Sequence, residues 1–117
     1  MLKLFRKGYE VSLNRVHDIV RIREGGDSLR LIVDADPMRM VAGLNEAQKI
    51  LKALNADSTA EDKRAAAEYF AEVIFGKEQA ESLLDFYRGD AVCVINVCGT
   101  YFRDRLGDLI TRAQKKG

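Results

Sequence analysis

Residues 19–37 read IVRIREGGDSLRLIVDADP, and this stretch decides the fold class. Apolar and charged residues alternate along 19–23 and along much of 29–33, which is the period of a half-buried β-strand. Residues 24–28 form a glycine-containing connection of hairpin length. The pattern therefore predicts a β-hairpin in the N-terminal part of the chain. An earlier stretch, Tyr9–Leu13, is a candidate third strand.

Helix signals begin where the hairpin ends. Asp36-Pro37 combines an N-cap carboxylate with a proline at the first helical position. Apolar residues then recur at spacings of three and four, which predicts a helix from Pro37 to about Leu54. Ser58-Thr59-Ala60-Glu61 matches a capping box between Ser58 and Glu61. It predicts a second helix, which ends at Gly76.

Two further helices are predicted after Gly76. A short one covers Ala80–Tyr87 and ends at Gly89, a residue suited to the left-handed position after a helix. Asp90 then caps a final helix, in which apolar residues continue at helical spacing for about six turns and only Arg105 breaks the stripe. The β-branched residues of 92–97 leave a strand ending near Cys98 as the alternative for the start of this helix.

These elements predict an α+β fold: a β-hairpin, with three short strands if Tyr9–Leu13 is one of them, followed by a bundle of about four helices. A chain of 117 residues can bury one hydrophobic core without disulfides or a structural metal, which indicates a single domain over 1–117. Its strand-rich part is 1–35 and its helical part is 36–117. A lone hairpin is only marginally stable in water, so this hairpin must pack on the helices or pair with another chain.

The small net charge of +1 hides an acidic middle between two basic ends. Residues 55–90 contain four basic and nine acidic residues, whereas 1–33 and 91–117 each have an excess of three basic residues. Either the solvated helix faces complement one another within the fold, or an acidic helical surface meets a basic partner. The candidate partner-binding residues are Glu61, Glu68 and Glu72 of the acidic helix, with Tyr87 and Arg88 at the end of the short helix.

Composition excludes several classes of function. The balanced charge removes the main compositional argument for nucleic-acid binding. No stretch approaches the roughly 18 apolar residues of a membrane span, and residues 1–7 lack the apolar core of a secretory signal. We therefore expect a cytoplasmic protein, in a bacterial host if a phage encodes it, that binds neither nucleic acid nor membrane.

The chain offers few groups for catalysis. His17 is the single histidine, so nucleophilic catalysis of the Ser-His-Asp or Cys-His kind would have to recruit it. Cys93 and Cys98 lie in an apolar segment and point about 140° apart on a helix, so they are expected to be core residues that do not bridge each other.

Ligand-binding signatures are also missing from the sequence. There is no phosphate-binding Gly-Lys-Ser/Thr, and the Asp34/Asp36 and Asp104/Asp108 pairs are better explained by capping and ion pairs than by a cation site. We predict no enzyme, metal, cofactor or small-molecule substrate. A deep polar pocket around His17 or Tyr101 would instead favour an enzyme or a small-molecule binder.

One segment resembles a known family. It consists of Phe75-Gly76, Leu83-Leu84 and Phe86-Tyr87-Arg88-Gly89-Asp90, followed by a long apolar-periodic helix. This arrangement is similar to the small tail assembly chaperones of long-tailed bacteriophages and prophages, over roughly the second half of the chain. The helix from Pro37 to Leu54 fits the family loosely, and the N-terminal strands fit it least.

The resemblance implies a non-enzymatic protein that binds the long tape-measure protein and keeps it soluble until tail-tube subunits polymerise around it. Gly76 and Gly89 would then serve as helix stops and Asp90 as a cap. The alternative is a structural phage protein, such as a connector or tail-completion subunit, in which the hairpin joins neighbouring subunits of a homo-oligomer.

Overall fold

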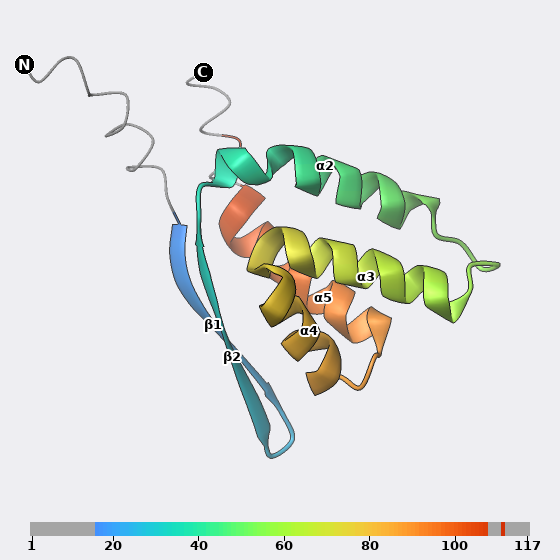
Figure 1. The fold of residues 1–117 in the computed structure, drawn as a ribbon, viewed down its shortest axis with the longest axis horizontal. Coiled ribbons are helices and arrows are strands. Elements are labelled where there is room, and N and C mark those ends of the chain that lie inside the picture. Colours follow the sequence, from blue (N-terminus) through green and yellow to red (C-terminus); the bar gives the residue numbers. More distant parts are fainter. Residues whose placement is uncertain (1–15, 108–110, 112–117) are drawn as a thin grey trace, which may run out of the picture.

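The computed structural model describes residues 16–107 and 111, and in it a long two-stranded hairpin lies along one side of a group of helices (Figure 1). The strands and helices, in chain order, are β1 (Val16–Glu24), β2 (Asp27–Ala35), α2 (Pro37–Ala53), α3 (Ala60–Phe75), α4 (Lys77–Phe86), α5 (Ala91–Tyr101) and the π-helical turn η2 (Phe102–Leu106). The predicted α+β class, a hairpin followed by four helices, is confirmed. The candidate third strand Tyr9–Leu13 lies outside the described residues.

The hairpin is longer and its turn tighter than the sequence pattern predicts. The two strands are antiparallel and pair continuously, from Val16 opposite Ala35 to Glu24 opposite Asp27. Only two residues, Gly25 and Gly26, connect them, and Gly25 has a φ of 59°, which glycine adopts without strain. Glu24 and Asp27, which the sequence pattern placed in the loop, are therefore the last paired residues of the two strands.

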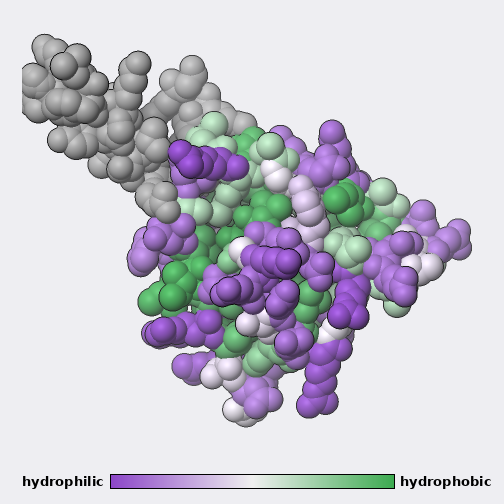
Figure 2. All heavy atoms as spheres, in the orientation of Figure 1, coloured by the Kyte–Doolittle hydropathy of each residue, from purple (hydrophilic) through white to green (hydrophobic). Residues whose placement is uncertain are grey.

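The hairpin has one buried and one exposed face. Val16, Ile22, Leu31 and Val33 point toward the helices and are buried. The opposite face carries arginines together with Ile19 and Ile32, which are 50% and 42% exposed and lie directly opposite each other. In Figure 2, apolar residues accordingly appear among hydrophilic ones on the hairpin side of the molecule.

Helix α2 begins as predicted. The Asp36 carboxylate accepts a hydrogen bond from the Met38 amide at 3.0 Å, and Pro37 occupies the first turn. A β-carbon at Gly43 would lie 3.0 Å from the Val73 methyl groups, so this glycine allows α2 to approach α3 closely.

The capping box of α3 lies one residue later than predicted. Thr59 is the N-cap: its hydroxyl accepts from the Asp62 amide at 3.0 Å, and Asp62 accepts from the Thr59 amide at 3.1 Å. The predicted pair of Ser58 and Glu61 is therefore wrong, because the Ser58 hydroxyl accepts from the Asn55 amide in the preceding turn. The helix does end before Gly76, whose φ is 87°.

The short helix and the start of the last helix also follow local signals. α4 begins at Lys77, three residues before the predicted start. Gly89, with a φ of 80°, donates its amide to the Leu84 carbonyl at 2.8 Å. Asp90 then caps α5 by accepting from the Val92 and Cys93 amides, at 3.1 and 3.4 Å. Residues 91–98 are helical, so the strand alternative is wrong.

The single helix predicted after Asp90 is continuous from Ala91 to Gly107 in the described residues, but part of it is π-helical rather than α-helical. In η2 the Gly107 amide bonds to the Phe102 carbonyl, five residues earlier, which is the π-helical spacing. In a regular α-helix Leu106 would point about 140° away from Tyr101. Within the described residues, the wider turn instead makes Leu106 the next buried residue after Tyr101. Arg105, which interrupts the predicted apolar stripe, is exposed and lies between the buried residues Tyr101 and Leu106 in the chain.

One hydrophobic core joins the hairpin to the helices. The largest fully buried side chains come from β2, α4, α5 and η2, namely Leu31, Val33, Leu83, Val94, Cys98 and Leu106. The hairpin is thus stabilised by packing on the helices, as its marginal intrinsic stability requires. Among residues 16–107 and 111, no helix is long and apolar enough to cross a membrane.

Candidate functional site: a groove beside an open strand edge

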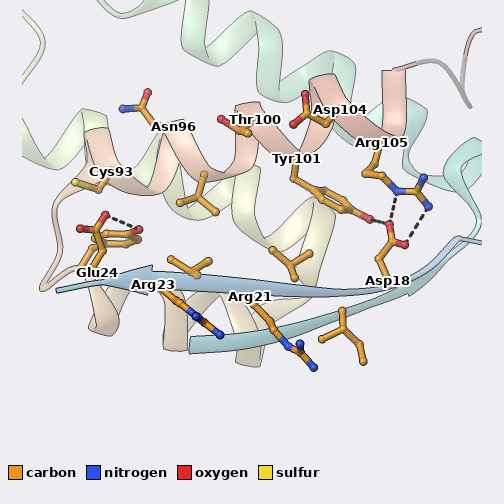
Figure 3. A pocket seen from close by; sticks show the side chains of 15 residues that line it. Asp18, Arg21, Arg23, Glu24, Cys93, Asn96, Thr100, Tyr101, Asp104 and Arg105 are labelled. Atoms are coloured by element: carbon orange, nitrogen blue, oxygen red, sulfur yellow. Dashed lines mark hydrogen bonds and ion pairs between the residues drawn. The ribbon is translucent and has the colours of Figure 1, made fainter. Parts of the chain in front are cut away.

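A groove with a volume of about 700 Å³ lies between β1 and α5 (Figure 3). From β1 it is lined by every residue of 18–24, which includes side chains of both faces of the hairpin. The other wall consists of Tyr87 and of one side of α5 and η2: Cys93, Asn96, Val97, Thr100, Tyr101, Asp104 and Arg105. Because both faces of β1 contribute, the groove follows the free edge of this strand.

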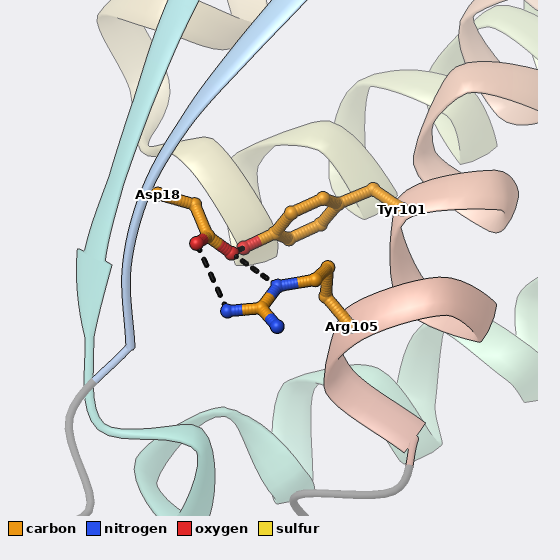
Figure 4. A network of polar contacts seen from close by, with 3 residues as sticks. All are labelled: Asp18, Tyr101 and Arg105. Carbon is orange, nitrogen blue, oxygen red and sulfur yellow. Dashed lines mark hydrogen bonds and ion pairs between the residues drawn. The ribbon is translucent and has the colours of Figure 1, made fainter.

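At one end of the groove, Asp18 of β1 accepts hydrogen bonds from Tyr101 and Arg105 on the opposite wall (Figure 4). The Tyr101 hydroxyl donates to Asp18 Oδ2 at 2.8 Å. Arg105 donates from Nε to the same oxygen at 2.8 Å and from Nη2 to Oδ1 at 3.0 Å. This bidentate, charge-assisted contact joins β1 to the π-helical turn, and the position of Arg105 on η2 makes it possible.

The charges of this cluster are set by their contacts. Hydrogen bonds from Arg105, and then from Tyr101, lower the pKa of Asp18 below its ordinary value, against the opposing effect of desolvation. Burial, with the hydrogen bond to Asp18, raises the pKa of Tyr101 above the usual range. At neutral pH Asp18 is therefore an anion that accepts three hydrogen bonds, and Tyr101 is a donor rather than a general base.

The other end of the groove has a weaker contact of the same kind. The Tyr87 hydroxyl donates to Glu24 at 3.5 Å, and burial raises the pKa of this tyrosine, with a further contribution from Glu24. Asp18 and Glu24 are six residues apart on β1, a separation of roughly 20 Å in an extended strand. Two tyrosine–carboxylate contacts thus mark the ends of the groove.

The middle of the groove is mainly apolar. Val20 and Ile22 of β1 and Val97 of α5 contribute to the hydrophobic cluster there. Cys93 also lines the groove, and desolvation, followed by contact with Asp90, raises the pKa of its thiol. Burial raises the pKa of the Cys98 thiol to about 12. Neither thiol is activated as a nucleophile.

The two edges of the hairpin differ in their backbone hydrogen bonds. On β2, the Gln79 side chain of α4 accepts from the Ile32 amide at 2.7 Å and donates to the Ile32 carbonyl at 2.7 Å. Both backbone groups of Ile32 therefore point away from β1, which makes Ile32 and Ile19 a non-hydrogen-bonded pair. The amide and carbonyl of Ile19 must then also point outward, away from β2.

The outward direction recurs at every second residue of β1, hence at His17, Ile19, Arg21 and Arg23. None of these backbone groups has a hydrogen-bond partner within 16–107 and 111. Among the described residues, the edge of β1 that faces away from β2 is therefore an open row of donors and acceptors beside an apolar groove.

The predicted partner-binding residues lie in two places. Glu61, Glu68 and Glu72 share one face of α3 and do not line the groove, whereas Tyr87 does. Arg88 is exposed next to Tyr87 and has a φ of 54°. Their binding role stays a prediction.

Sequence reasoning missed the contact of Asp18 with Arg105 and the bonds of Gln79 to β2. For the contact between Asp18 and Arg105, the only hint in the sequence was that Arg105 interrupts the apolar stripe of the last helix. No local signal marked Gln79.

A pocket near His17 or Tyr101 was the expected sign of an enzyme or small-molecule binder. The groove does adjoin Tyr101, so that hypothesis is not removed, although the hydroxyl is already engaged with Asp18. His17 does not line the groove; it is exposed, with Nδ1 3.8 Å from the Asp34 carboxylate. The described part of the chain contains no group of three or more His, Cys, Asp or Glu side chains that could hold a metal ion.

Comparison with models of protein families, with curated proteins and with solved structures gave no match.

Proposed function

We propose that this protein is a non-enzymatic assembly chaperone of phage or prophage tails, which binds the tape-measure protein and keeps it soluble before the tail tube forms. The observation that carries the proposal is the open edge of β1 beside an apolar groove. The resemblance of Phe75–Asp90 to tail assembly chaperones supplies the identity of the client.

The groove has the composition of a protein-binding site. Backbone donors and acceptors along β1 bind any extended chain regardless of its sequence, whereas the apolar middle selects hydrophobic side chains. These are the two properties that a chaperone needs in order to hold a long, unassembled protein.

The size of the groove favours reversible binding. A segment that spans roughly 20 Å contains about six residues, far fewer than the 20 to 30 residues a side of a stable protein interface. Single contacts are therefore expected to be weak, and several copies along a long client would add up. Weak individual contacts also allow release when tail-tube subunits arrive.

Co-expression tests the proposal. The wild-type chain should increase the soluble yield of the tape-measure protein encoded nearby. Thr100→Arg, which places a large charged group in the groove from an exposed position, should reduce this effect. Asn45→Arg on the exposed surface of α2 is the matched control and should behave like wild type. If the wild-type chain bound no tail protein, the proposal would be lost.

The exposed face of the hairpin favours a second candidate, a structural phage protein that acts through oligomerisation. Ile19 and Ile32 are exposed side by side there and would be covered in a contact between subunits. Light scattering of the purified chain distinguishes the two. A stable ring or oligomer that Ile32→Asp converts to monomer favours the structural role, and a monomeric wild type favours the chaperone.

A further inference from the structure

We infer that the groove accepts an extended segment of the partner protein as a third strand along β1, and that apolar and acidic residues alternate in this segment. The inference rests on the proposed function, because it describes the part of the client that would be held.

The backbone of β1 determines the binding mode. The free groups of Ile19, Arg21 and Arg23 repeat every second residue, roughly 7 Å apart, which is the repeat of a neighbouring β-strand. A helix or a folded surface does not present donors and acceptors at this spacing. The other edge of the sheet is already bonded to Gln79 at Ile32, so a third strand is directed to β1.

The groove determines which side chains point inward. Val20 and Ile22 are directed from β1 to the helical side, where Val97 forms the opposite wall. In an added strand, alternate residues lie on this same face, directly beside Val20 and Ile22. Those residues are expected to be apolar, because Val20, Ile22 and Val97 have no side-chain group that could pair with a buried polar group.

The exposed face determines the residues in between. Arg21 and Arg23 point away from α5 (Figure 3), and Arg21 lies directly opposite Arg30 of β2. None of the three has an ion-pair partner within the described ranges, and like charges opposite each other destabilise a sheet. Acidic side chains at the outward positions of an added strand would neutralise this cluster. Charge complementarity thus specifies an acidic outward face.

The ends of the groove determine its length. Tyr101 bonded to Asp18 and Tyr87 bonded to Glu24 close it at residues 18 and 24 of β1. The segment held between them therefore contains about six or seven residues.

The test uses a fluorescently labelled peptide with blocked ends, Val-Glu-Val-Glu-Val-Glu-Val, and the full chain. Fluorescence anisotropy should show saturable binding. N-methylation of alternate amides removes the strand-bonding donors and should weaken binding by about tenfold or more. A third peptide has the same composition but its valines and glutamates in separate blocks, so it cannot place apolar and acidic residues on opposite faces of a strand. It should bind more weakly than either of the other two peptides. Equal binding of all three peptides would overturn the inference.

A charge exchange tests the acidic alternation. Arg21→Glu should lower the affinity for the glutamate peptide by several-fold and raise the affinity for the corresponding lysine peptide. Lys49→Glu, at an exposed position of α2, is the control and should leave the preference unchanged. An unaltered preference in Arg21→Glu would contradict an acidic partner.

Amide hydrogen exchange locates the peptide. The amides of Ile19 and Arg21 should gain protection when the peptide binds, and the Ile32 amide should not change. Binding without this protection would overturn strand addition. The chain's own residues 9–13, Tyr-Glu-Val-Ser-Leu, have the same alternation and lie outside the described structure. Protection of Ile19 and Arg21 in the free chain that is lost in Val11→Pro would replace the partner with this segment, and so would also overturn the inference.

These outcomes are separable from the proposed function. If the peptide does not bind but the tape-measure protein is still kept soluble, the binding mode is wrong and the chaperone role stands. If the chain has no effect on any tail protein, the chaperone role is wrong, and the inference, which rests on it, is lost with it.

Discussion

The two edges of the hairpin differ although the strands have the same length and pair without interruption. On the β2 side, Gln79 takes up both backbone groups of Ile32, and the inward residues Leu31 and Val33 are each only 1% exposed. On the β1 side, the outward backbone groups have no partner in the described part of the chain, and Val20 is only partly buried. Open strand edges tend to pair with other chains. By bonding to Ile32, the Gln79 side chain makes the edge of β2 less available for pairing than the edge of β1. A further strand is therefore expected to add to β1.

The largest expected effect compares two residues that lie directly opposite each other, Val20 on β1 and Leu31 on β2. Leu31→Ala should lower the free energy of unfolding by about 2–5 kcal/mol, because it leaves a cavity in the core. Val20→Ala should cost only about 1 kcal/mol, because its side chain adjoins the groove. Urea denaturation of both variants measures the difference. Equal losses would mean that the two sides of the hairpin are packed equally well.

The Asp18 contact is the strongest polar link of the open side, and Asp18→Asn should reduce stability at pH 7 by about 1–2 kcal/mol. This magnitude allows for an Arg105 side chain that is 52% exposed to solvent. The folded-state pKa of Asp18 lies below its unfolded value, so its contribution is fully present above about pH 4 and is lost as pH falls through the folded pKa.

Thermal unfolding between pH 7 and pH 2 checks this dependence. The difference in stability between wild type and Asp18→Asn should shrink toward the acid end. Asn45→Ala, an exposed change on α2 that alters no ionisable group, is the control and should leave the acid limb unchanged. A constant difference across the range would show that the ionised form of Asp18 is not what stabilises the fold.

Gln79→Ala should make the closed edge resemble the open one, at a cost of about 1 kcal/mol. The loss is small because water can replace the amide at Ile32, which is 42% exposed. Hydrogen exchange of the Ile32 amide should then become as fast as that of Ile19. Glu78→Ala at the neighbouring exposed position should leave the exchange of Ile32 slow. Unchanged exchange in Gln79→Ala would mean that other groups protect this edge.

The smallest effect has the opposite sign. Arg30→Glu replaces a like-charge pair with an opposite-charge pair across from Arg21 and should stabilise the hairpin by about 0.2–1 kcal/mol. The gain should shrink at high salt, as expected for an exposed pair. No gain at low salt would mean that the arginines of this face do not repel one another appreciably.

Local sequence signals were enough to predict the hairpin and most helix ends. Asp36-Pro37, Gly76, Gly89 and Asp90 act within one or two turns of their own position, so their effects can be predicted without tertiary information. Thr59 shows the limit of such reasoning, because two neighbouring hydroxyls compete for one cap and the preceding turn takes Ser58.

The groove depends on contacts that no local pattern contains. Gln79 and Ile32 are 47 residues apart, and Asp18 and Arg105 are 87 residues apart. Their meeting depends on how the hairpin lies across the helices. Arg105 was visible only as an interruption of an apolar stripe, since the sequence does not reveal that a π-helical turn shifts the burial pattern there.

The π-helical turn also has a consequence for insertions and deletions. Loss of one residue between Tyr101 and Leu106 would turn their spacing of five into the spacing of four found in an ordinary α-helix, so both could remain in the core. Arg105 would then follow Tyr101 by three residues instead of four, about 60° from it around an α-helix and one residue's rise, about 1.5 Å, closer to it along the axis. A single-codon deletion in this turn should therefore be tolerated by the core, and its main effect would fall on the geometry of the contact between Arg105 and Asp18.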